Sequence, residues 1–495
     1  MKKHISLLIC FTATLTFVSC SDWLDVKPST QLDREELLSS EKGYGEAIAG
    51  IYARMCRASL YGREMTWGAM DVLAGNYTAL TLPAMYNGIK EYAYVESGGS
   101  SVSTDAVRML EQFWSGLYNV IAGINSILEN IDDNRYLFTE DNYSVIKGEA
   151  IGLRAFLHFE LYRMFADVYE KSKDQEILPY VVKLTPLVTP LLTGEEMMSV
   201  IISQLEEAVR LLENDPMRLG TTPPHVLASS TSGNISAWHN RRFHFNYYAA
   251  KATLARVYLW KGDKENALRT ALEVIDDQPT RFPWVLTTNL TSIELGSGTN
   301  QDRTFATEHI FALNVMNMDN LISGFLNNIP VSDGTNLRLT SMRNMFATND
   351  QGVDPRFRYM YTMHSANEFM LSKFYQPAMV SSHFKYRMPL IRISEMYYIV
   401  AECADNWEDG LEYLEIVRRQ RGYTTMPLTN VNNQQTLLNE IYTEYRKEFT
   451  GEGQLWFWYK RQQSPAITNM TFNRGLEAYI FPYPENEILY GNREL

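Results

Sequence analysis

The sequence is poor in the residues that hold metal ions. Its 495 residues include four cysteines and eight histidines. No two cysteines stand at the Cys-x-x-Cys spacing, and no His-Glu-x-x-His segment occurs. Zinc sites are usually built from such closely spaced ligands. We therefore expect neither a metal ion nor a cofactor.

Clustered positive charge is missing as well. The formal net charge is −13, and no block of lysine and arginine stands out. Nucleic-acid binding requires clustered cations that neutralise phosphates, so no nucleic-acid partner is expected. After the first twenty residues, no apolar run reaches the roughly 18 residues that a transmembrane helix needs. Attachment to a membrane would therefore depend on a lipid.

Catalytic motifs are the third absence. No Gly-x-Ser-x-Gly segment occurs, and Gly451-x-Gly453 continues to Trp456 where a dinucleotide-binding loop would have glycine. Acid pairs such as Glu195-Glu196 lie on an amphipathic pattern, which is typical of a solvated helix face. We expect a protein that is not an enzyme. A glycan hydrolase on a helical scaffold stays open as an alternative, because two carboxylates can meet across a cleft from distant positions.

The N-terminus has the pattern of an export signal. Lys2 and Lys3 precede an almost entirely apolar or small run that ends before Cys20. A cysteine at this position, after a small residue, is typical of a bacterial lipoprotein. We predict a signal peptide over residues 1–19, lipidation of Cys20 and a polar tether over residues 20–38. The alternative is an ordinary cleaved signal with an incidental cysteine.

Helical periodicity dominates the remaining chain, so we predict a mainly α fold in one domain, residues 39–495. Thr193 and Glu196 form a capping box ahead of a helix over residues 197–212. Further helices are expected at about 243–261, 264–276, 390–404, 408–420 and 434–449. The helical scaffold is expected over about 39–61, 103–214, 243–279 and 387–450.

Two helix pairs resemble degenerate tetratricopeptide repeats. Leu254, Ala255, Tyr258 and Ala267 stand at the spacings of that repeat, and we expect them to be buried against one another. The pair over 390–420 repeats the pattern more loosely. Such pairs leave an apolar face open and must stack into an α-α superhelix.

The two cysteines outside the N-terminal region, Cys56 and Cys403, both fall in helical apolar patterns. They are expected to be buried thiols, and a single long-range disulfide between them stays open.

Three long segments break the helical pattern, at about 62–102, 215–242 and 280–386. The third contains short β-like runs such as 309–315. Segments of this length are usually functional or disordered, and these are too aromatic to be simple linkers. We expect them to form a loop-rich ligand-binding face.

Several local blocks resemble the SusD/RagB family, the surface nutrient-binding lipoproteins of Bacteroidetes. The resemblance covers the whole mature chain. The blocks are Phe245 to Asp263, Arg387 to Glu402, the Arg446/Glu448-Phe449/Gly451-Glu452-Gly453/Trp456-Phe457 cluster, Phe481-Pro482-Tyr483-Pro484 with Glu487-Ile488, Asp354-Pro355-Arg356, and the start at Cys20-Ser21-Asp22-Trp23-Leu24-Asp25.

The resemblance implies the function, the partner and the location of the protein. It implies a tetratricopeptide-like scaffold and capture of a nutrient, most often an oligosaccharide or polysaccharide and sometimes a peptide. It implies delivery to a SusC-like TonB-dependent transporter, and therefore a lipid-anchored position in the outer membrane facing the cell exterior. A repeat scaffold that binds only protein stays open as a further alternative.

Family resemblance also places ligand loops early in the chain and again after the central helix pair. Sugars stack their C–H faces on aromatic rings and offer hydroxyls to polar side chains. The tryptophans of these loops could instead plug local cores, and that alternative stays open. The predicted stacking residues are Trp67, Tyr77, Tyr86, Tyr92, Trp238 and Trp284, and the predicted hydroxyl-binding residues are Asp71, Asn76 and Asn87.

Overall fold

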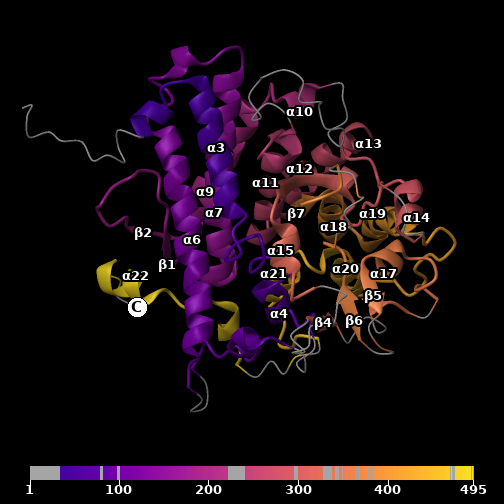
Figure 1. Ribbon diagram of the computed structural model, residues 1–495. Coiled ribbons are helices and arrows are strands. Elements are labelled where there is room, and N and C mark those ends of the chain that lie inside the picture. Colours follow the sequence, from indigo (N-terminus) through magenta and orange to yellow (C-terminus); the bar gives the residue numbers. More distant parts are fainter. Residues whose placement is uncertain are drawn as a thin grey trace, which may run out of the picture.

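Helices dominate the structure, which is a computed structural model of the chain (Figure 1). It describes residues 34–493 except for gaps at 78–81, 97–100, 221–239, 295–298, 327–336, 340–344, 348, 364, 366–367, 376–379, 381–382, 469, 471–473 and 492. Cys20 and Trp238 lie outside the described residues.

The longer helices pack one against the next in a continuous series, which confirms the predicted helical scaffold. In Figure 1 the early helices α3, α6, α7 and α9 stand side by side, and the later pairs extend from them. The series is α3 (Glu41–Met55), α6 (Thr104–Leu128), α7 (Asn142–Phe165), α9 (Gly194–Leu211), α11 (Tyr247–Lys261), α12 (Lys264–Asp276), α18 (Ile393–Cys403), α19 (Trp407–Gln420) and α20 (Gln434–Phe449).

Local capping fixes where these helices begin and end. The Thr193 hydroxyl accepts from the Glu196 backbone N–H while the Glu196 carboxylate accepts from the Thr193 N–H, so α9 starts with the predicted capping box. Asn246 caps α11 by accepting from two backbone N–H groups. Gly262 ends α11 at φ 83°, a left-handed conformation that suits glycine. The tight turn that follows lets α12 fold back onto α11.

The seam of that helix pair is as predicted. Leu254, Ala255, Tyr258 and Ala267 are all buried. The second pair, α18 and α19, approaches as closely. A Cβ added at Gly410 would lie 2.4 Å from the Ala401 carbonyl oxygen, so only glycine fits this crossing.

The β structure is small, and one strand corrects a predicted helix boundary. The run expected at 309–315 is strand β3 (His309–Asn314), which pairs antiparallel with β7 (Arg387–Arg392). The helix expected to start at 390 therefore begins at Ile393, because residues 387–392 are fully buried β strand. The remaining strands are β1 (Glu176–Pro179) with β2 (Leu191–Thr193), and β6 (Phe369–Leu371) between β4 (Arg338–Leu339) and β5 (Tyr361–Met363).

Short helices and turns form the other segments. They are α4 (Ala69–Leu73), η3 (Ala84–Tyr86), α5 (Asn87–Lys90), η4 (Arg135–Leu137), α8 (Tyr169–Ser172), α10 (Pro216–Leu219), η6 (Arg241–Phe243), α13 (Gln278–Arg281), α14 (Thr287–Glu294), η7 (Ala306–Glu308), α15 (Met318–Ile322), α17 (Pro355–Tyr359), α21 (Leu455–Arg461), η8 (Leu476–Tyr479) and α22 (Glu485–Tyr490).

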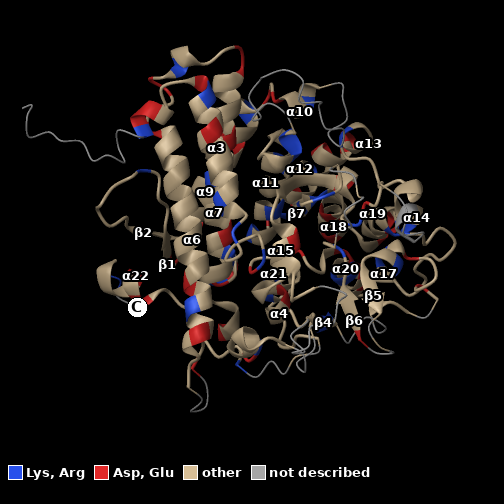
Figure 2. Ribbon diagram, viewed as in Figure 1, with Lys and Arg blue, Asp and Glu red and all other residues tan. Residues whose placement is uncertain are grey.

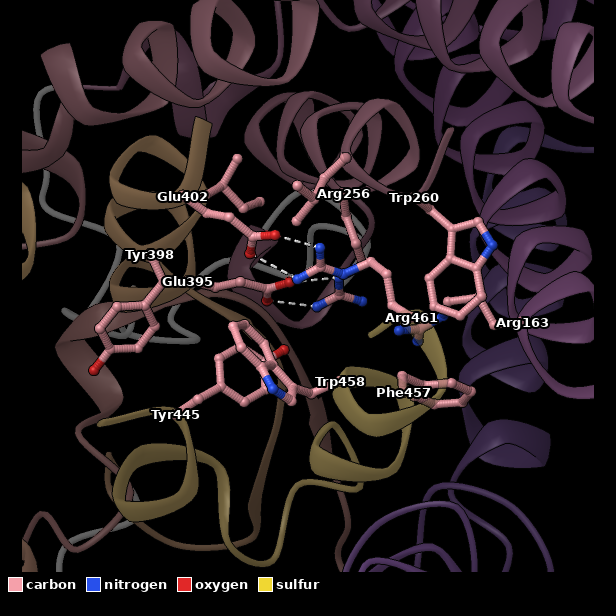
Figure 3. Close-up of a pocket in the computed structure, with 12 residues that line it drawn as sticks. Arg163, Arg256, Trp260, Glu395, Tyr398, Glu402, Tyr445, Phe457, Trp458 and Arg461 are labelled. Carbon is pink, nitrogen blue, oxygen red and sulfur yellow. Dashed lines mark hydrogen bonds and ion pairs between the residues drawn. The ribbon is translucent and has the colours of Figure 1, made fainter. Parts of the chain in front are cut away.

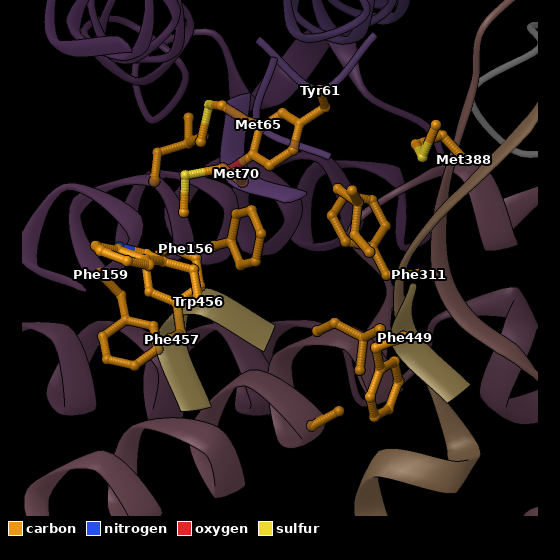
Figure 4. Packing of buried hydrophobic residues seen from close by; sticks show 14 of the residues in the cluster. Tyr61, Met65, Met70, Phe156, Phe159, Phe311, Met388, Phe449, Trp456 and Phe457 are labelled. Carbon is orange, nitrogen blue, oxygen red and sulfur yellow. The ribbon is translucent and has the colours of Figure 1, made fainter. Parts of the chain in front are cut away.

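One aromatic-rich core joins early and late parts of the chain. Figure 4 shows Tyr61 and Met65 from the early segment near Phe156 of α7 and Trp456 of α21. Burial of this shared surface supplies most of the favourable free energy of folding. Cys56 and Cys403 carry free thiols, so the alternative of a disulfide between them is not realised. None of the described helices is both long and apolar enough to cross a bilayer.

Candidate functional site

A small pocket between helices is part of the scaffold. Figure 3 shows its arginine and glutamate side chains paired between α11, α18 and α21, with Arg256 Nη2 lying 2.6 Å from Glu395 Oε2. Arg461 Nη2 lies 2.7 Å from Glu402 Oε2. The pocket holds only about 30 Å³, which is room for about one water molecule. It cannot take a sugar ring.

A larger hollow opens beside α3. We call it the α3 hollow, and it has a volume of about 520 Å³. Three parts of the chain form its wall: the C-terminal half of α3, the η6 turn and the end of β3. Its lining residues are Ala49, Tyr52, Ala53, Cys56, Asn240, Phe243, His244, Asn314, Met316 and Asn317.

A buried carboxylate fixes the base of the α3 hollow. The Tyr52 hydroxyl donates to Glu149 Oε1 at 2.6 Å and accepts from the Phe245 N–H at 2.7 Å. His244 Nδ1 lies 2.7 Å from the same Glu149 oxygen, and Arg241 pairs with the other oxygen. These contacts tie α3, α7 and the η6 turn together, so the rings of Tyr52 and His244 are held in place.

The charge of Glu149 is balanced inside the protein. Burial alone would raise the pKa of Glu149, but the neighbouring Arg241 and His244 and the hydrogen bonds from His244 and Tyr52 lower it to about 2. The carboxylate is therefore ionised at neutral pH with its oxygens occupied by three side chains. It is a structural group with no free oxygen to act as a general base.

The lining of the α3 hollow suits neutral polar ligands. Asn314 and Asn317 are exposed, and Asn240 Oδ1 is a buried acceptor with no hydrogen-bond partner among the described residues. The rings of Tyr52, Phe243 and His244 and the thioether of Met316 add apolar surface. No aspartate or glutamate is among the lining residues, so this hollow lacks the pair of carboxylates that glycoside hydrolysis needs.

A second, more open groove lies along α20 and α21 and measures about 450 Å³. It carries amides such as Asn439 and Gln462 beside Tyr442 and Trp458. The Tyr442 hydroxyl bonds to Tyr459 and Thr468, both at 2.7 Å, so its oxygen is already engaged within the protein.

The structure places most of the predicted ligand residues in the core. Trp67, Asp71, Asn76, Tyr77, Tyr86 and Tyr92 are all buried. A ring that is enclosed on both faces cannot stack on a sugar, so burial favours the alternative that these side chains plug a local core. Of this early set, only Asn87 is exposed.

The hydroxyls of the early tyrosines are used inside the protein. Tyr77 donates to the Trp67 carbonyl at 2.7 Å, and Tyr92 donates to the Leu73 carbonyl at 3.0 Å. Tyr92 also stacks on Trp456 with a ring-centroid distance of 5.8 Å. The early segment therefore packs against α21 near the C-terminus and stabilises its position.

Asp71 makes the same connection through the backbone. Its Oδ2 accepts from the Gly451 N–H at 2.6 Å. Gly451 and Gly453 have φ of 88° and 69°, so the turn between α20 and α21 requires glycine at both positions. Burial raises the pKa of Asp71 to about 7, although the hydrogen bonds from Gly451 and Asn76 act against it.

Trp284 is partly buried, and its ring contacts scaffold residues. The guanidinium carbon of Arg421 lies 5.4 Å from the centroid of the Trp284 ring, and the Tyr397 and Trp284 ring centroids are 5.3 Å apart. Asn87, Trp284 and the residues of the α3 hollow belong to different parts of the chain, and none of the predicted residues that the structure describes lines the hollow.

Three of the blocks that carry the family resemblance, those with Arg356, Arg392 and Glu448, meet in a buried ion network. Arg356 of the Asp354-Pro355-Arg356 block lies 2.7 Å from Glu444 and 2.9 Å from Glu448. Arg392 pairs with Glu448 and lies 2.8 Å from Glu452. These blocks therefore hold the fold together, and they do not line the α3 hollow. Figure 2 shows the two signs of charge interspersed along the ribbon.

Comparisons with known proteins give two family matches. The family described as "SusD family" matches residues 313–492, and the family described as "Starch-binding associating with outer membrane" matches residues 22–233. SusD-like protein P2 of Formosa agariphila is 26% identical over 285 residues, which are 56% of this chain and 47% of that protein. SusD-like protein P38 of the same organism is 24% identical over 43% of this chain and 39% of its own length. The chain thus matches less than half the length of these relatives.

Solved structures share the fold. A SusD-like carbohydrate-binding protein from Bacteroides vulgatus superposes with a TM-score of 0.67 at 17% identity, covering 92% of this chain and 97% of that one. A SusD superfamily protein from Bacteroides thetaiotaomicron gives 0.66 at 21% identity, covering 91% and 97%. A laminarin-binding SusD-like protein gives 0.61 at 17% identity, covering 91% and 97%.

The stacked helix pairs define a tetratricopeptide-like scaffold. The chain belongs to the SusD/RagB family, as its sequence blocks predicted. Members of this family are binding proteins and not enzymes.

Proposed function

We propose that this protein is a cell-surface lipoprotein that captures a glycan and delivers it to a SusC-like TonB-dependent transporter in the outer membrane. The observation that carries the proposal is the α3 hollow, whose lining combines amides with rings and contains no carboxylate. Amides satisfy sugar hydroxyls, and rings offer apolar surface to sugar C–H faces. The lipid anchor at Cys20 and the outward orientation belong to the same proposal.

The names of related proteins support a carbohydrate as the ligand. One structural neighbour is called carbohydrate-binding and another laminarin-binding. One of the two matching families is described as starch-binding and associated with the outer membrane. A neutral oligosaccharide or polysaccharide is the ligand class that fits an uncharged lining.

Binding would be tested by calorimetry against a panel of neutral polysaccharides and their oligosaccharides, with a peptide panel beside it. The double variant Asn314→Ala/Asn317→Ala removes two exposed amides from the α3 hollow. Each lost hydrogen bond costs about 0.5–1.5 kcal/mol, so we expect Kd to rise about tenfold.

Two control variants locate the site. Asn87→Ala probes the early segment, and Asn439→Ala probes the groove along α20. Both remove an exposed amide from another surface, so both should bind like the parent. Loss of affinity in Asn87→Ala alone would move the site to the early segment. Binding to peptides only would replace the glycan by a peptide, and release of reducing sugar would support the hydrolase alternative.

A further inference from the structure

Two of the most deeply buried arginines have no carboxylate partner. Five arginines are among the largest fully buried side chains of the described residues: Arg242, Arg356, Arg387, Arg392 and Arg421. Arg356, Arg392 and Arg421 each pair with at least two carboxylates. Within the described part of the chain, Arg242 and Arg387 form no ion pair at all. A buried cation is normally paired, so these two are exceptions.

The N–H groups of this pair are equally unsatisfied. Arg242 Nε and Nη2 and Arg387 Nε, Nη1 and Nη2 have no acceptor among the described residues. Arg242 Nη1 makes one long hydrogen bond, 3.4 Å, to the Ala306 carbonyl. The centroid of the Phe243 ring lies 4.7 Å from the Arg387 guanidinium carbon. An aromatic ring attracts the cation but offers its N–H groups no oxygen acceptor.

The charges around the pair do not balance. Asp302 is the carboxylate whose charge acts on both arginines, and its two oxygens accept from the Ala306 N–H at 2.8 Å. Arg242 and Arg387 also repel each other, which after burial contributes to lowering the pKa of Arg242. His309 adds no charge here, because burial lowers its pKa well below the usual range. Two cations and one carboxylate leave an excess positive charge in the interior.

The segments directly before Arg242 and Arg387 add no acid. The stretches 221–239 and 376–382 contain neither aspartate nor glutamate. Within the described residues neither guanidinium has a carboxylate partner, so the pair is open to an anion from outside the chain.

We propose that Arg242 and Arg387 bind a small monovalent anion, chloride under physiological conditions. A halide needs only N–H donors and positive charge, which are what this pair presents. Both side chains are enclosed, at 1% and 0% exposure of the residue, so a desolvated single ion fits better than a sulfate or the acid group of a sugar. Arg242 adjoins Phe243 and Arg387 pairs with Asn314 in the β3–β7 register, so the anion lies behind two lining residues of the α3 hollow.

Bromide replaces chloride and scatters anomalously, which gives a direct test. Crystals of the wild-type protein grown in sodium bromide should show an anomalous peak between the two guanidinium groups. The proposal is overturned if data from well-ordered crystals show no peak there, or if ordinary density in chloride is fully explained by water.

Thermal unfolding gives a second, independent test. Wild-type Tm should rise by roughly 2 °C between sodium gluconate and sodium chloride at equal ionic strength, because only the native state binds the ion. Arg387→Met removes one cation and should abolish that rise. The control Arg108→Met, at an exposed arginine whose side chain is 62% accessible, should keep it.

Each outcome of the unfolding test decides the matter. Equal Tm in the two salts for the wild type, or a chloride response retained by Arg387→Met, would overturn the proposal. If Arg387→Met does not fold, the bromide crystal and the chloride dependence of the wild-type Tm still support or overturn the proposal.

Discussion

Replacing Glu448 by glutamine perturbs the centre of the buried ion network. One carboxylate oxygen of Glu448 lies 2.6 Å from Arg421, and the other lies 2.9 Å from Arg356. Arg392 pairs with Glu448 as well. All four side chains are fully buried. Glu448→Gln keeps the shape of the side chain, removes its charge and turns one acceptor into an N–H donor that faces a guanidinium.

The expected cost is large because three cations lose a shared partner. Arg356 keeps Asp354 and Glu444, Arg392 keeps Glu452, and Arg421 keeps Glu308. Removing one partner of a buried ion pair typically costs about 3–5 kcal/mol. We expect the free energy of unfolding to fall by about 3 kcal/mol or more.

Urea denaturation followed by circular dichroism at pH 7 measures this change. The matched control is Glu170→Gln, because Glu170 is 78% exposed and lies 2.6 Å from Lys173. An exposed pair of this kind contributes little to stability, because water screens both charges. A loss in Glu448→Gln no greater than in Glu170→Gln would refute the reasoning, since the buried network would then contribute no more than a surface pair.

The pH dependence of the free energy of unfolding tests the same ion network and predicts the direction of the change. Burial alone would raise the pKa of Glu448, but Arg421, Arg392 and Arg356 hold it well below the usual range. The unfolded value is about 4.3. The stability that Glu448 contributes is therefore present above about pH 4.3 and lost as the pH falls toward the lower folded pKa. The difference between the wild type and Glu448→Gln should shrink on acidification from pH 7 to 3.

Three further predictions concern the seam, the early segment and the anchor. Ala255→Trp overfills the fully buried seam of α11 and α12 and should lower the free energy of unfolding by about 1–3 kcal/mol, whereas unchanged denaturation would contradict the close approach. The raised pKa of Asp71, about 7, means that the folded state holds this proton more tightly than the unfolded state, so the contribution of Asp71 to the free energy of unfolding, measured as the difference from Asp71→Asn, should fall by about 2–4 kcal/mol as the pH rises from 4 to 7. An identical pH profile in both proteins would argue against a buried carboxyl. Cys20→Ala should move the protein from the membrane fraction to the soluble fraction on cell fractionation, and unchanged partitioning would rule out this anchor.

The scaffold could be predicted from the sequence because each of its signals is local. The Thr193-to-Glu196 capping box needs only the spacing of two residues, and α9 begins at Gly194, directly after Thr193. Periodic apolar positions located α12, and the small residues Ala255 and Ala267 indicated its close packing on α11. The boundary at 390–393 was wrong because residues 388–391 are a short apolar run within strand β7, which pairs with β3, and periodicity alone does not separate a short buried strand from a helix start.

The binding surface was harder to predict because an aromatic side chain in a loop has two uses. Trp67 and Tyr92 are in an irregular segment, which indicated exposure, but the Trp67 ring packs on Phe325 and the Tyr92 ring stacks on Trp456, both far along the chain. A pattern read over a short stretch of sequence cannot predict a contact between residues so far apart in the chain. Asn314 and Asn317 gave a weak indication of a polar binding surface, because these two amides lie at and just after the end of the predicted β run. His244 lines the hollow only because its ring is held by Glu149, which lies 95 residues earlier in the chain.

The residues that identify the family and the residues that line the α3 hollow are separate sets. Arg356, Arg392 and Glu448 are held by many simultaneous contacts, so a change at one of them leaves a buried charge without its partner. Exposed lining residues such as Asn314 and Met316 carry no comparable constraint, because water can replace the contacts that they lose. The ion network therefore lets one scaffold keep its fold while the lining changes. It follows that family membership predicts the scaffold of this protein well, and that the identity of the proposed glycan ligand depends on the lining of the hollow.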